Sequence, residues 1–380
     1  MRRSDTGRRS RVLPARIGVI GCGWWATRAH LPALARNPAA VIAAIVDPDD
    51  GNRSRAAERF DVPEERAFAD AADMYAAIEL DGAIVAVPHA LHAGVATGAL
   101  DRGLHVLLEK PMTIRSDDAK ELHELAVARG VELIIGYPWH YNAHATSLRE
   151  VVRSGELGRL ELIAAQYVAK ARALYRGRPG ELEAELGYPV HGPASDTYAD
   201  PEIAGGGQGM TQTTHALALM LWLTEARAIS LFALTEAHEL EVDLVDGLLI
   251  RFEGGAIGTL ASSGSLVRAE HERMELRVYG DEGHAIMDLS AGRAGVVSRH
   301  GTRDLEILPQ QQRAPEGAPA DNLVDVILGR DANRSPGELG WRTVALVEAM
   351  YRSSREARMI ELDRGRQAWD PGTDAPGSLV

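Results

Sequence analysis

The residues best suited to chemistry at neutral pH are a lysine and a histidine that lie far apart in the chain. Lys110 ends the segment HVLLEK and is followed by Pro111, and His215 ends the glycine-rich segment GGGQGMTQTTH, after which an apolar helix is expected. An ammonium group can polarise a substrate hydroxyl, and imidazole suits a general base near pH 7. Both residues are therefore candidates for catalysis. Taken alone, each also fits a simpler interpretation, a solvated strand end for Lys110 and a buried core residue for His215.

A second chemical signal is the segment GCGWWA at residues 21–26, which directly follows the apolar run RIGVI. It matches G-x-G-x-x-A between a strand and a helix, where Gly21 and Gly23 let a pyrophosphate approach the backbone at the positive helix N-terminus. Trp24 and Trp25 occupy the same turn and are further candidate cofactor contacts. The alternative is a tight strand-to-helix turn that binds no ligand.

Asp47 supplies the acidic residue that a dinucleotide site needs at the end of the second strand. A carboxylate at this position can hydrogen-bond both ribose hydroxyls and repels a 2′-phosphate, which favours NAD over NADP. Two alternatives remain open. Asp47 can simply begin the turn DPDDG, and Arg53 nearby is compatible with NADP.

These residues need a scaffold, and the first half of the chain has the pattern of a parallel α/β sheet. Short apolar runs at residues 16–21, 41–47, 82–87, 105–110 and 131–137 alternate with helical-period segments at 30–36, 53–60, 71–78, 92–102 and 116–129. This alternation predicts a Rossmann domain over residues 15–141. Lys110 then lies at the carboxyl end of a strand, the edge where doubly wound sheets bind ligands.

The second half of the chain has a different pattern, which predicts an α+β domain over residues 142–365. Helices are expected at 148–155 and 339–358, and strands of a mostly antiparallel open sheet at 160–171, 228–237, 247–253, 256–264 and 274–280. A long segment rich in Gly, Pro and Tyr, residues 174–203, separates the first two strands and is expected to be functional or flexible. Residues 1–14 and 366–380 are expected to be disordered tails.

Together, these segments resemble the glucose-fructose oxidoreductase, inositol dehydrogenase and MocA (Gfo/Idh/MocA) family, from Arg16 to about Leu362. The resemblance rests on motifs in the family's order: IGVIGCG, HLPAL from His30, Val87-Pro88-His89 with His92, Glu109-Lys110-Pro111, the turn GELG at 155–158, the GGG-to-His215 segment, FEGG from Phe252 and VYGDEG from Val278.

The resemblance implies an NAD-dependent oxidoreductase acting on a sugar, inositol or glycoside. In such an enzyme Lys110 contacts the nicotinamide and the reacting hydroxyl, and His215 accepts the hydroxyl proton. The remaining implied contacts are Pro88, His89, His92 and Glu109 for the cofactor, and Trp139, His140, Tyr198 and Thr211 for the substrate. His89 and His92 are three positions apart but have no evident third ligand, so no metal site is predicted.

The chain departs from the family pattern at Thr211, where many polyol dehydrogenases carry an aspartate four residues before the histidine. A threonine cannot stabilise an imidazolium electrostatically, so either Asp196 or Asp200 replaces that carboxylate or the chemistry differs. One different chemistry is a redox glycosidase, in which transient oxidation permits elimination of the aglycone before the hydride returns. A third hypothesis is a non-catalytic NAD sensor, but the presence of Lys110 and His215 argues against it.

Composition restricts the possible partners and location. The net charge of -13 argues against a nucleic-acid-binding protein, and a single cysteine, Cys22, excludes an intramolecular disulfide. Uninterrupted apolar runs fall well short of the roughly 20 residues needed to span a membrane. We therefore expect a cytoplasmic protein with a small-molecule substrate, and the family resemblance implies a homodimer or homotetramer.

Overall fold

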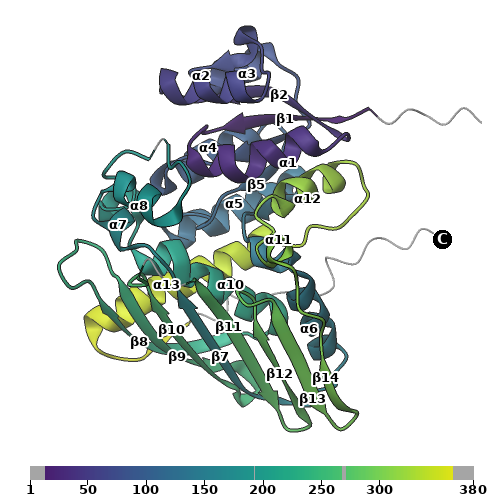
Figure 1. The fold of residues 1–380 in the computed structure, drawn as a ribbon, viewed down its shortest axis with the longest axis vertical. Coiled ribbons are helices and arrows are strands. Elements are labelled where there is room, and N and C mark those ends of the chain that lie inside the picture. The colour runs from purple at the N-terminus through teal and green to yellow at the C-terminus, as the bar shows by residue number, and fades with distance from the viewer. Residues whose placement is uncertain (1–12, 192, 268–270, 363–380) are drawn as a thin grey trace, which may run out of the picture.

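The computed structural model describes residues 13–191, 193–267 and 271–362. The predicted tail at 366–380, and residues 1–12 of the predicted tail at 1–14, lie outside these described residues. Figure 1 shows a parallel sheet with its helices above a broad second sheet, with α10 and α13 between them. In the part of the chain that is described, no helix is both long and apolar enough to cross a membrane.

The N-terminal domain is built on a six-stranded sheet in the order β3-β2-β1-β4-β5-β6. All of its pairings are parallel, which confirms the predicted Rossmann architecture. The strands are β1 (Ala15–Ile20), β2 (Ala40–Val46), β3 (Ala67–Phe68), β4 (Gly82–Val85), β5 (His105–Leu108) and β6 (Leu133–Ile135). The strand order reverses between β1 and β4, so the crevice at their carboxyl ends is where a ligand is expected to bind.

Helices cover both faces of this sheet, which is why its strands read as continuous apolar runs. Ile17, Ile84 and Leu107 are completely buried. The helices are α1 (Leu31–Arg36), which continues a π-helical turn (Ala26–His30), α2 (Asp50–Arg59), α3 (Ala71–Ala77), α4 (His92–Leu100) and α5 (Ser116–Arg129).

The C-terminal half forms a nine-stranded sheet in the order β14-β13-β12-β11-β7-β10-β9-β8-β15. Every pairing is antiparallel except that of β7 with β10, so the prediction of a mostly antiparallel sheet is confirmed. The strands are β7 (Leu160–Val168), β8 (Ala228–Glu236), β9 (Val245–Phe252), β10 (Ile257–Ser263), β11 (Arg273–Gly280), β12 (Gly283–Asp288), β13 (Arg293–Ser298), β14 (Gly301–Asp304) and β15 (Ile360–Glu361). The last four were not predicted, because they are short and rich in polar residues or glycine.

One face of the large sheet packs against α6 (Ala143–Arg153), α10 (Thr214–Thr224) and α13 (Gly337–Glu356). Every residue of α10 is buried, so this helix forms the centre of the second core. The opposite face is open and presents apolar side chains: Leu234, Leu249 and Ile257 are 62%, 46% and 49% exposed.

Two segments of the C-terminal half return to the Rossmann domain. Helix α12 (Ala318–Ile327), which follows α11 (Gln310–Arg313), places Leu323 and Val324 in the same core as Ile17. The long segment predicted at 174–203 includes α8 (Pro179–Leu186). Helix α7 (Arg172–Tyr175) overlaps its start, and α9 (Pro201–Ala204) overlaps its end. The segment packs against the dinucleotide turn, where Tyr188 stacks on Trp24 with ring centroids 6.2 Å apart.

Candidate active site

The glycine-rich turn after β1 has the backbone shape that a dinucleotide requires. Gly21 has φ +92°, and a Cβ there would lie 2.3 Å from the carbonyl oxygen of Ala86, so only glycine fits. A Cβ on Gly23 would meet nothing closer than the carbonyl oxygen of His191 at 4.0 Å. The turn is therefore tight on its inner side and has room above Gly23 for a pyrophosphate to approach the backbone.

Asp47 is fixed beside this turn at the end of β2. Its carboxylate accepts hydrogen bonds from the backbone N–H of Cys22 at 2.8 Å and of Asp49 at 2.9 Å. Each carboxylate oxygen can accept more than one hydrogen bond, so Asp47 can still bind ribose hydroxyls. Arg53 donates to the backbone carbonyl of Asp47 and forms an ion pair with Asp50. The turn and this carboxylate together fit a dinucleotide.

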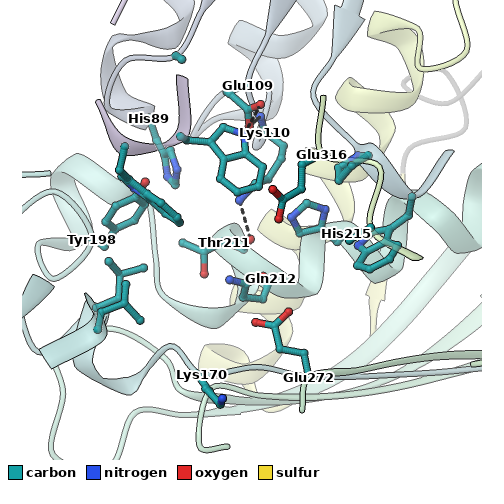
Figure 2. Close-up of a pocket in the computed structure, with 18 of the residues that line it drawn as sticks. His89, Glu109, Lys110, Lys170, Tyr198, Thr211, Gln212, His215, Glu272 and Glu316 are labelled. Atoms are coloured by element: carbon teal, nitrogen blue, oxygen red, sulfur yellow. Dashed lines mark hydrogen bonds between the residues drawn. The ribbon is translucent and has the colours of Figure 1, made fainter. Parts of the chain in front are cut away.

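A cavity of about 190 Å³ opens beside the turn and brings together many of the predicted residues (Figure 2). The predicted residues that line it are Trp24, Trp25, His89, His92, Glu109, Lys110, Trp139, Tyr198, Thr211 and His215. They come from both halves of the chain, so the cavity lies between the domains.

Lys110 extends from the end of β5 into this cavity and reaches the helix of the other domain. Its ammonium donates a hydrogen bond to the carbonyl oxygen of Thr211 at 3.0 Å. Burial lowers the pKa of Lys110, while the nearby carboxylates of Glu109 and Glu272 act in the opposite direction. The lowered pKa makes it easier for the ammonium to release a proton near neutral pH.

Glu109 is a buried carboxylate held rigidly behind the cavity. It accepts a hydrogen bond from the indole N–H of Trp25 at 2.9 Å and bonds Nε2 of His30 at 2.8 Å. Burial opposes its ionisation, but the hydrogen bond and charge of His30, the charge of Lys110 and the bond from Trp25 lower its pKa overall. A Cβ on Gly136 would lie 2.5 Å from this carboxylate, so Gly136 makes room for it.

His215 lies in the first turn of α10 and is 6% exposed. Its ring contacts Tyr137 and Tyr167 edge-on, and its Nδ1 has no hydrogen-bond partner among the described residues. Burial, and then the charge of Lys110, lower the pKa of His215 well below its ordinary value, so the imidazole is neutral. His215 also lines the cavity, so a ligand bound there can contact the imidazole ring.

Thr211 lies one helical turn before His215, and its hydroxyl is already engaged. It donates to the carbonyl oxygen of Gly207 at 2.8 Å and contacts the hydroxyl of Tyr175. The surrounding turn is held by Asp243, whose carboxylate accepts the backbone N–H groups of Gly207 and Gly209, each at 2.7 Å. Thr211 therefore faces the cavity mainly as a backbone acceptor for Lys110.

Neither aspartate considered as a replacement for the family's missing carboxylate lines the cavity. Asp196 is exposed, and Asp200 caps α9 by accepting the backbone N–H of Glu202 at 2.8 Å. The carboxylates that do line it, besides Glu109, are Glu272 and Glu316, and Figure 2 shows both directed toward the space bordered by Lys110 and His215.

Glu272 and Glu316 differ in their environments. Glu316 forms an ion pair with Arg28 at 3.0 Å. Burial raises the pKa of Glu272 against the opposing charge of Lys170, and the charge of Glu316 adds to the rise. Sequence reasoning missed both glutamates, and also Lys170 and Tyr188 in the cavity wall, because none belongs to a recognisable motif. It missed Gln212 as well, although this residue lies within GGGQGMTQTTH.

Two histidines near the strand ends have structural partners. His89 bonds the carbonyl oxygen of Ala204 through Nδ1, and burial lowers its pKa to about 3. Both ring nitrogens of His92 lie within 2.9 Å of the carbonyl oxygens of Pro111 and Val87. Among the described residues, no group of three or more possible ligands could hold a metal ion.

Pro88 and His140 are the remaining predicted contacts, and neither lines the cavity. Pro88 lies between two residues that do. His140 is completely buried, stacks on Trp222 with ring centroids 4.9 Å apart and bonds the Ser335 hydroxyl through Nδ1. We therefore leave His140 out of the proposed substrate site.

Comparison with known proteins agrees with this architecture. Residues 15–137 match the model of the oxidoreductase family with an NAD-binding Rossmann fold, and residues 146–286 match the GFO/IDH/MocA C-terminal domain. A dTDP-3,4-didehydro-2,6-dideoxy-alpha-D-glucose 3-reductase from Saccharopolyspora spinosa is 26% identical over 72% of this chain and 75% of that enzyme. Inositol 2-dehydrogenase from Corynebacterium glutamicum is 34% identical over 39% of this chain and 44% of that enzyme.

The fold is also that of a solved relative. The crystal structure of GenD2 from gentamicin A biosynthesis, in complex with NAD, superposes with a TM-score of 0.76 at 23% identity and covers 93% of this chain and 97% of GenD2. The two family models lie side by side along the chain and together account for most of it. This chain belongs to the Gfo/Idh/MocA family of oxidoreductases, and its N-terminal domain is an NAD-binding Rossmann domain.

Proposed function

We propose that this protein is an NAD-dependent dehydrogenase that reversibly oxidises a secondary hydroxyl of a sugar, polyol or glycoside to a ketone. The observation that carries the proposal is the meeting of Lys110 and His215, from different domains, in one cavity beside the dinucleotide turn. The names of the relatives support a sugar-related substrate, since they include an inositol dehydrogenase and a reductase of a dTDP-linked sugar.

Bound NAD supplies the acceptor for the hydride, and the chain's own residues hold it and handle the proton. The turn at Gly21 and Gly23 receives the pyrophosphate, and Asp47 receives the ribose hydroxyls. A 2′-phosphate beside Asp47 meets an ionised carboxylate. Arg53, which would favour NADP, is occupied by Asp50 and the Asp47 carbonyl. We therefore propose NAD rather than NADP as the physiological cofactor.

Lys110 and His215 have different roles toward the substrate hydroxyl. The ammonium of Lys110 has three N–H donors, of which one is used on Thr211, so it can also bind and polarise the substrate oxygen. Neutral His215, whose ring lines the cavity, offers one ring nitrogen as an acceptor for the hydroxyl proton. Because burial disfavours the imidazolium, Lys110 with its lowered pKa is positioned to share the proton with it.

A second candidate function is the redox glycosidase, and Glu272 is the observation that favours it. Its raised pKa leaves a larger fraction of the carboxyl protonated near neutral pH, and a protonated carboxyl can donate its proton to a leaving glycosidic oxygen. In such a cycle, oxidation of the hydroxyl would acidify the neighbouring C–H bond, a base would take that proton as the aglycone leaves, and addition of water and return of the hydride would leave NAD unchanged overall.

The deciding experiment follows reduced-nicotinamide absorbance of the protein with NAD and a panel of sugars, inositols and aryl glycosides. A substrate-dependent rise that Lys110→Ala abolishes would support the dehydrogenase. Release of an aglycone without net NADH would favour the glycosidase. Tight NAD binding with neither signal across the panel would contradict both and leave the sensor hypothesis.

The open face of the large sheet suggests the assembly. Its exposed apolar side chains, Leu234, Leu249 and Ile257 among them, would be covered if two copies packed face to face. We propose a homodimer or homotetramer built on this face, and light scattering of the purified chain would test it.

A further inference from the structure

Residues 187–191 of the C-terminal domain lie over the dinucleotide turn, on the side from which a pyrophosphate approaches the backbone. The carbonyl oxygen of His191 lies 4.0 Å from the position of a Cβ on Gly23. Tyr188 stacks on Trp24 of the same turn, with ring centroids 6.2 Å and planes 22° apart. NAD therefore cannot pass straight from solvent to the turn while these residues lie there.

Tyr188 is also held by an arginine–glutamate pair. The Arg28 guanidinium lies over the Tyr188 ring, 3.8 Å from its centroid, and binds Glu316 through Nε and Nη2, each at 3.0 Å. Arg28 belongs to the π-helical turn Ala26–His30 that follows the dinucleotide turn, and Glu316 to the loop between α11 and α12. Arg28, Tyr188 and Glu316, which we call the clamp, thus join three separate segments beside the NAD site.

The clamp can open without unfolding either domain. The side chains of Arg28 and Glu316 are 34% and 29% exposed, so their separation does not uncover a core. The segment that carries Tyr188 is anchored at Leu182 and Val190, which are buried with Tyr175 in a small apolar cluster separate from the larger cores. A segment held by a small cluster and one partly exposed ion pair belongs to the less stable part of a fold.

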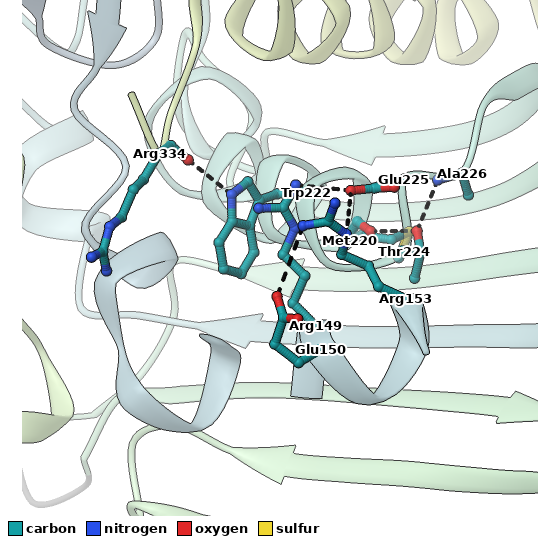
Figure 3. Close-up of polar contacts among 9 residues, drawn as sticks. All are labelled: Arg149, Glu150, Arg153, Met220, Trp222, Thr224, Glu225, Ala226 and Arg334. Atoms are coloured by element: carbon teal, nitrogen blue, oxygen red, sulfur yellow. Dashed lines mark hydrogen bonds and ion pairs between the residues drawn. The ribbon is translucent and has the colours of Figure 1, made fainter. Parts of the chain in front are cut away.

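A similar group of side chains occurs inside the C-terminal domain, away from the dinucleotide turn. The Arg149 guanidinium lies 4.4 Å from the centroid of the Trp222 ring and donates to Glu225 at 2.9 Å (Figure 3). These residues lie on α6 and at the end of α10, within one domain. Arg149 therefore makes the same kinds of contact as Arg28 in a different place, and it provides a matched control.

We infer that the clamp gates the NAD site, so that NAD enters and leaves only when Arg28, Tyr188 and Glu316 separate. Bound NAD is then enclosed between the turn at Gly23 and residues 187–191. Exchange of the cofactor is slow because it waits for this opening, as binding does wherever a conformational change must come first. The inference rests on the NAD-binding Rossmann domain and not on the substrate that is oxidised.

The test measures the rate constants of NADH binding and release by stopped-flow energy transfer from tryptophan to the bound cofactor. Release is followed when the NADH complex is mixed with excess NAD. We expect Tyr188→Ala and Arg28→Gln each to raise both rate constants about tenfold. The stack and the cation contact together are worth about the 1.4 kcal/mol that a tenfold change in rate represents. Tyr188→Phe, which keeps the ring, and Arg149→Gln should exchange NADH at the parent rates.

The binding rate distinguishes a gate from a direct contact. A side chain that only contacted NAD would, when removed, raise the release rate without raising the binding rate. The inference is overturned if neither Tyr188→Ala nor Arg28→Gln raises both rate constants, or if Arg149→Gln accelerates exchange as much as Arg28→Gln does. These outcomes need no turnover of substrate, so they are distinct from failure of the proposed dehydrogenase activity.

Discussion

The ammonium of Lys110 lies 3.0 Å from the carbonyl oxygen of Thr211 and donates a hydrogen bond to it. This bond joins the end of a Rossmann strand to the helical turn that presents His215, so the two candidate catalytic groups are positioned relative to each other across the domain boundary. Thr211 thus contributes its backbone rather than its side chain to this contact. The remaining donors of Lys110 are available to a substrate and a cofactor.

Replacing Lys110 with methionine tests its proposed role. Methionine preserves most of the length and apolar stem of lysine but removes the charge and the donors. We expect kcat for the best substrate to fall by about 10²- to 10⁴-fold, the usual contribution of a positioned acid or base. NAD affinity, measured by fluorescence titration, should change by less than about threefold, since Gly21, Gly23 and Asp47 are untouched.

Lys120→Met is the matched control, because Lys120 lies on α5 with its side chain 41% exposed, and its contacts, an ion pair with Glu124 and the ring of Trp341, lie outside the cavity. It should leave kcat unchanged. If Lys110→Met turned over substrate at the parent rate, the proposed active site would have to be abandoned.

Asp47→Asn should reduce the preference for NAD over NADP. The amide keeps one acceptor for the backbone N–H groups that Asp47 binds, but it loses the charge that repels a 2′-phosphate. We expect the ratio of kcat/KM for NAD to that for NADP to fall by about 10- to 100-fold. Asp73→Asn, an exposed position on α3 of the same domain, should leave the ratio as it is. An unchanged ratio in Asp47→Asn would exclude Asp47 as the specificity residue.

The elements of the Rossmann half could be predicted closely because each one has a local sequence pattern. Each buried strand is a continuous apolar run, and a segment with helical periodicity follows it. The C-terminal sheet was predicted only as far as its apolar strands. Strands β12 to β14 lie at one end of the sheet, where β14 (GTRD) is the exposed edge strand and β12 (GHAIMD) is only partly buried, so none has a strong apolar pattern. Helix α12 begins with APADN and gave no clear signal, although it packs on the first domain.

The site divides in the same way. Residues in motifs, such as Lys110 and His215, could be expected in one site because the family resemblance implies it, and both line the cavity. Glu272 and Glu316 could not, because they are single charges in loops that reach the cavity only through the tertiary fold. His140 differs from its neighbour Trp139, which lines the cavity, because His140 stacks on Trp222 in the core.

Gly21→Ala tests whether the turn after β1 requires glycine at this position in particular. Its positive φ and the 2.3 Å approach to the Ala86 carbonyl make a Cβ strained and sterically excluded. We expect the free energy of unfolding to fall by about 2 kcal/mol or more, and NAD binding to be lost. Urea denaturation and fluorescence titration measure the two effects.

Gly94→Ala is the matched control, because Gly94 lies inside α4 and a Cβ there meets nothing within 4 Å. Alanine at a helix interior should raise the free energy of unfolding by about 0.5–1 kcal/mol. Equal effects of the two substitutions would show that Gly21 has no special role in the turn.

Acid should destabilise the fold steeply, because burial lowers the pKa of four histidines in the interior, and also that of the partly exposed His105. The pKa values of His89 and His140 fall to about 3, and those of His92 and His215 are also lowered. In the unfolded chain these groups return to their ordinary pKa of 6.5. Below pH 6.5 the unfolded state therefore binds more protons than the folded state. The free energy of unfolding then decreases as the pH is lowered.

Each such histidine contributes a slope of up to about 1.4 kcal/mol per pH unit between pH 6.5 and its folded pKa. Urea unfolding at pH 7, 6 and 5 should show the free energy of unfolding falling increasingly steeply. His140→Gln should lower the stability at pH 7, because the stack on Trp222 is lost, but should flatten the dependence below pH 6. His300→Gln, at an exposed position, should leave the slope unchanged. A parent protein equally stable at pH 7 and pH 5 would contradict the burial of neutral histidines, because their protonation in the unfolded chain has to appear as lost stability.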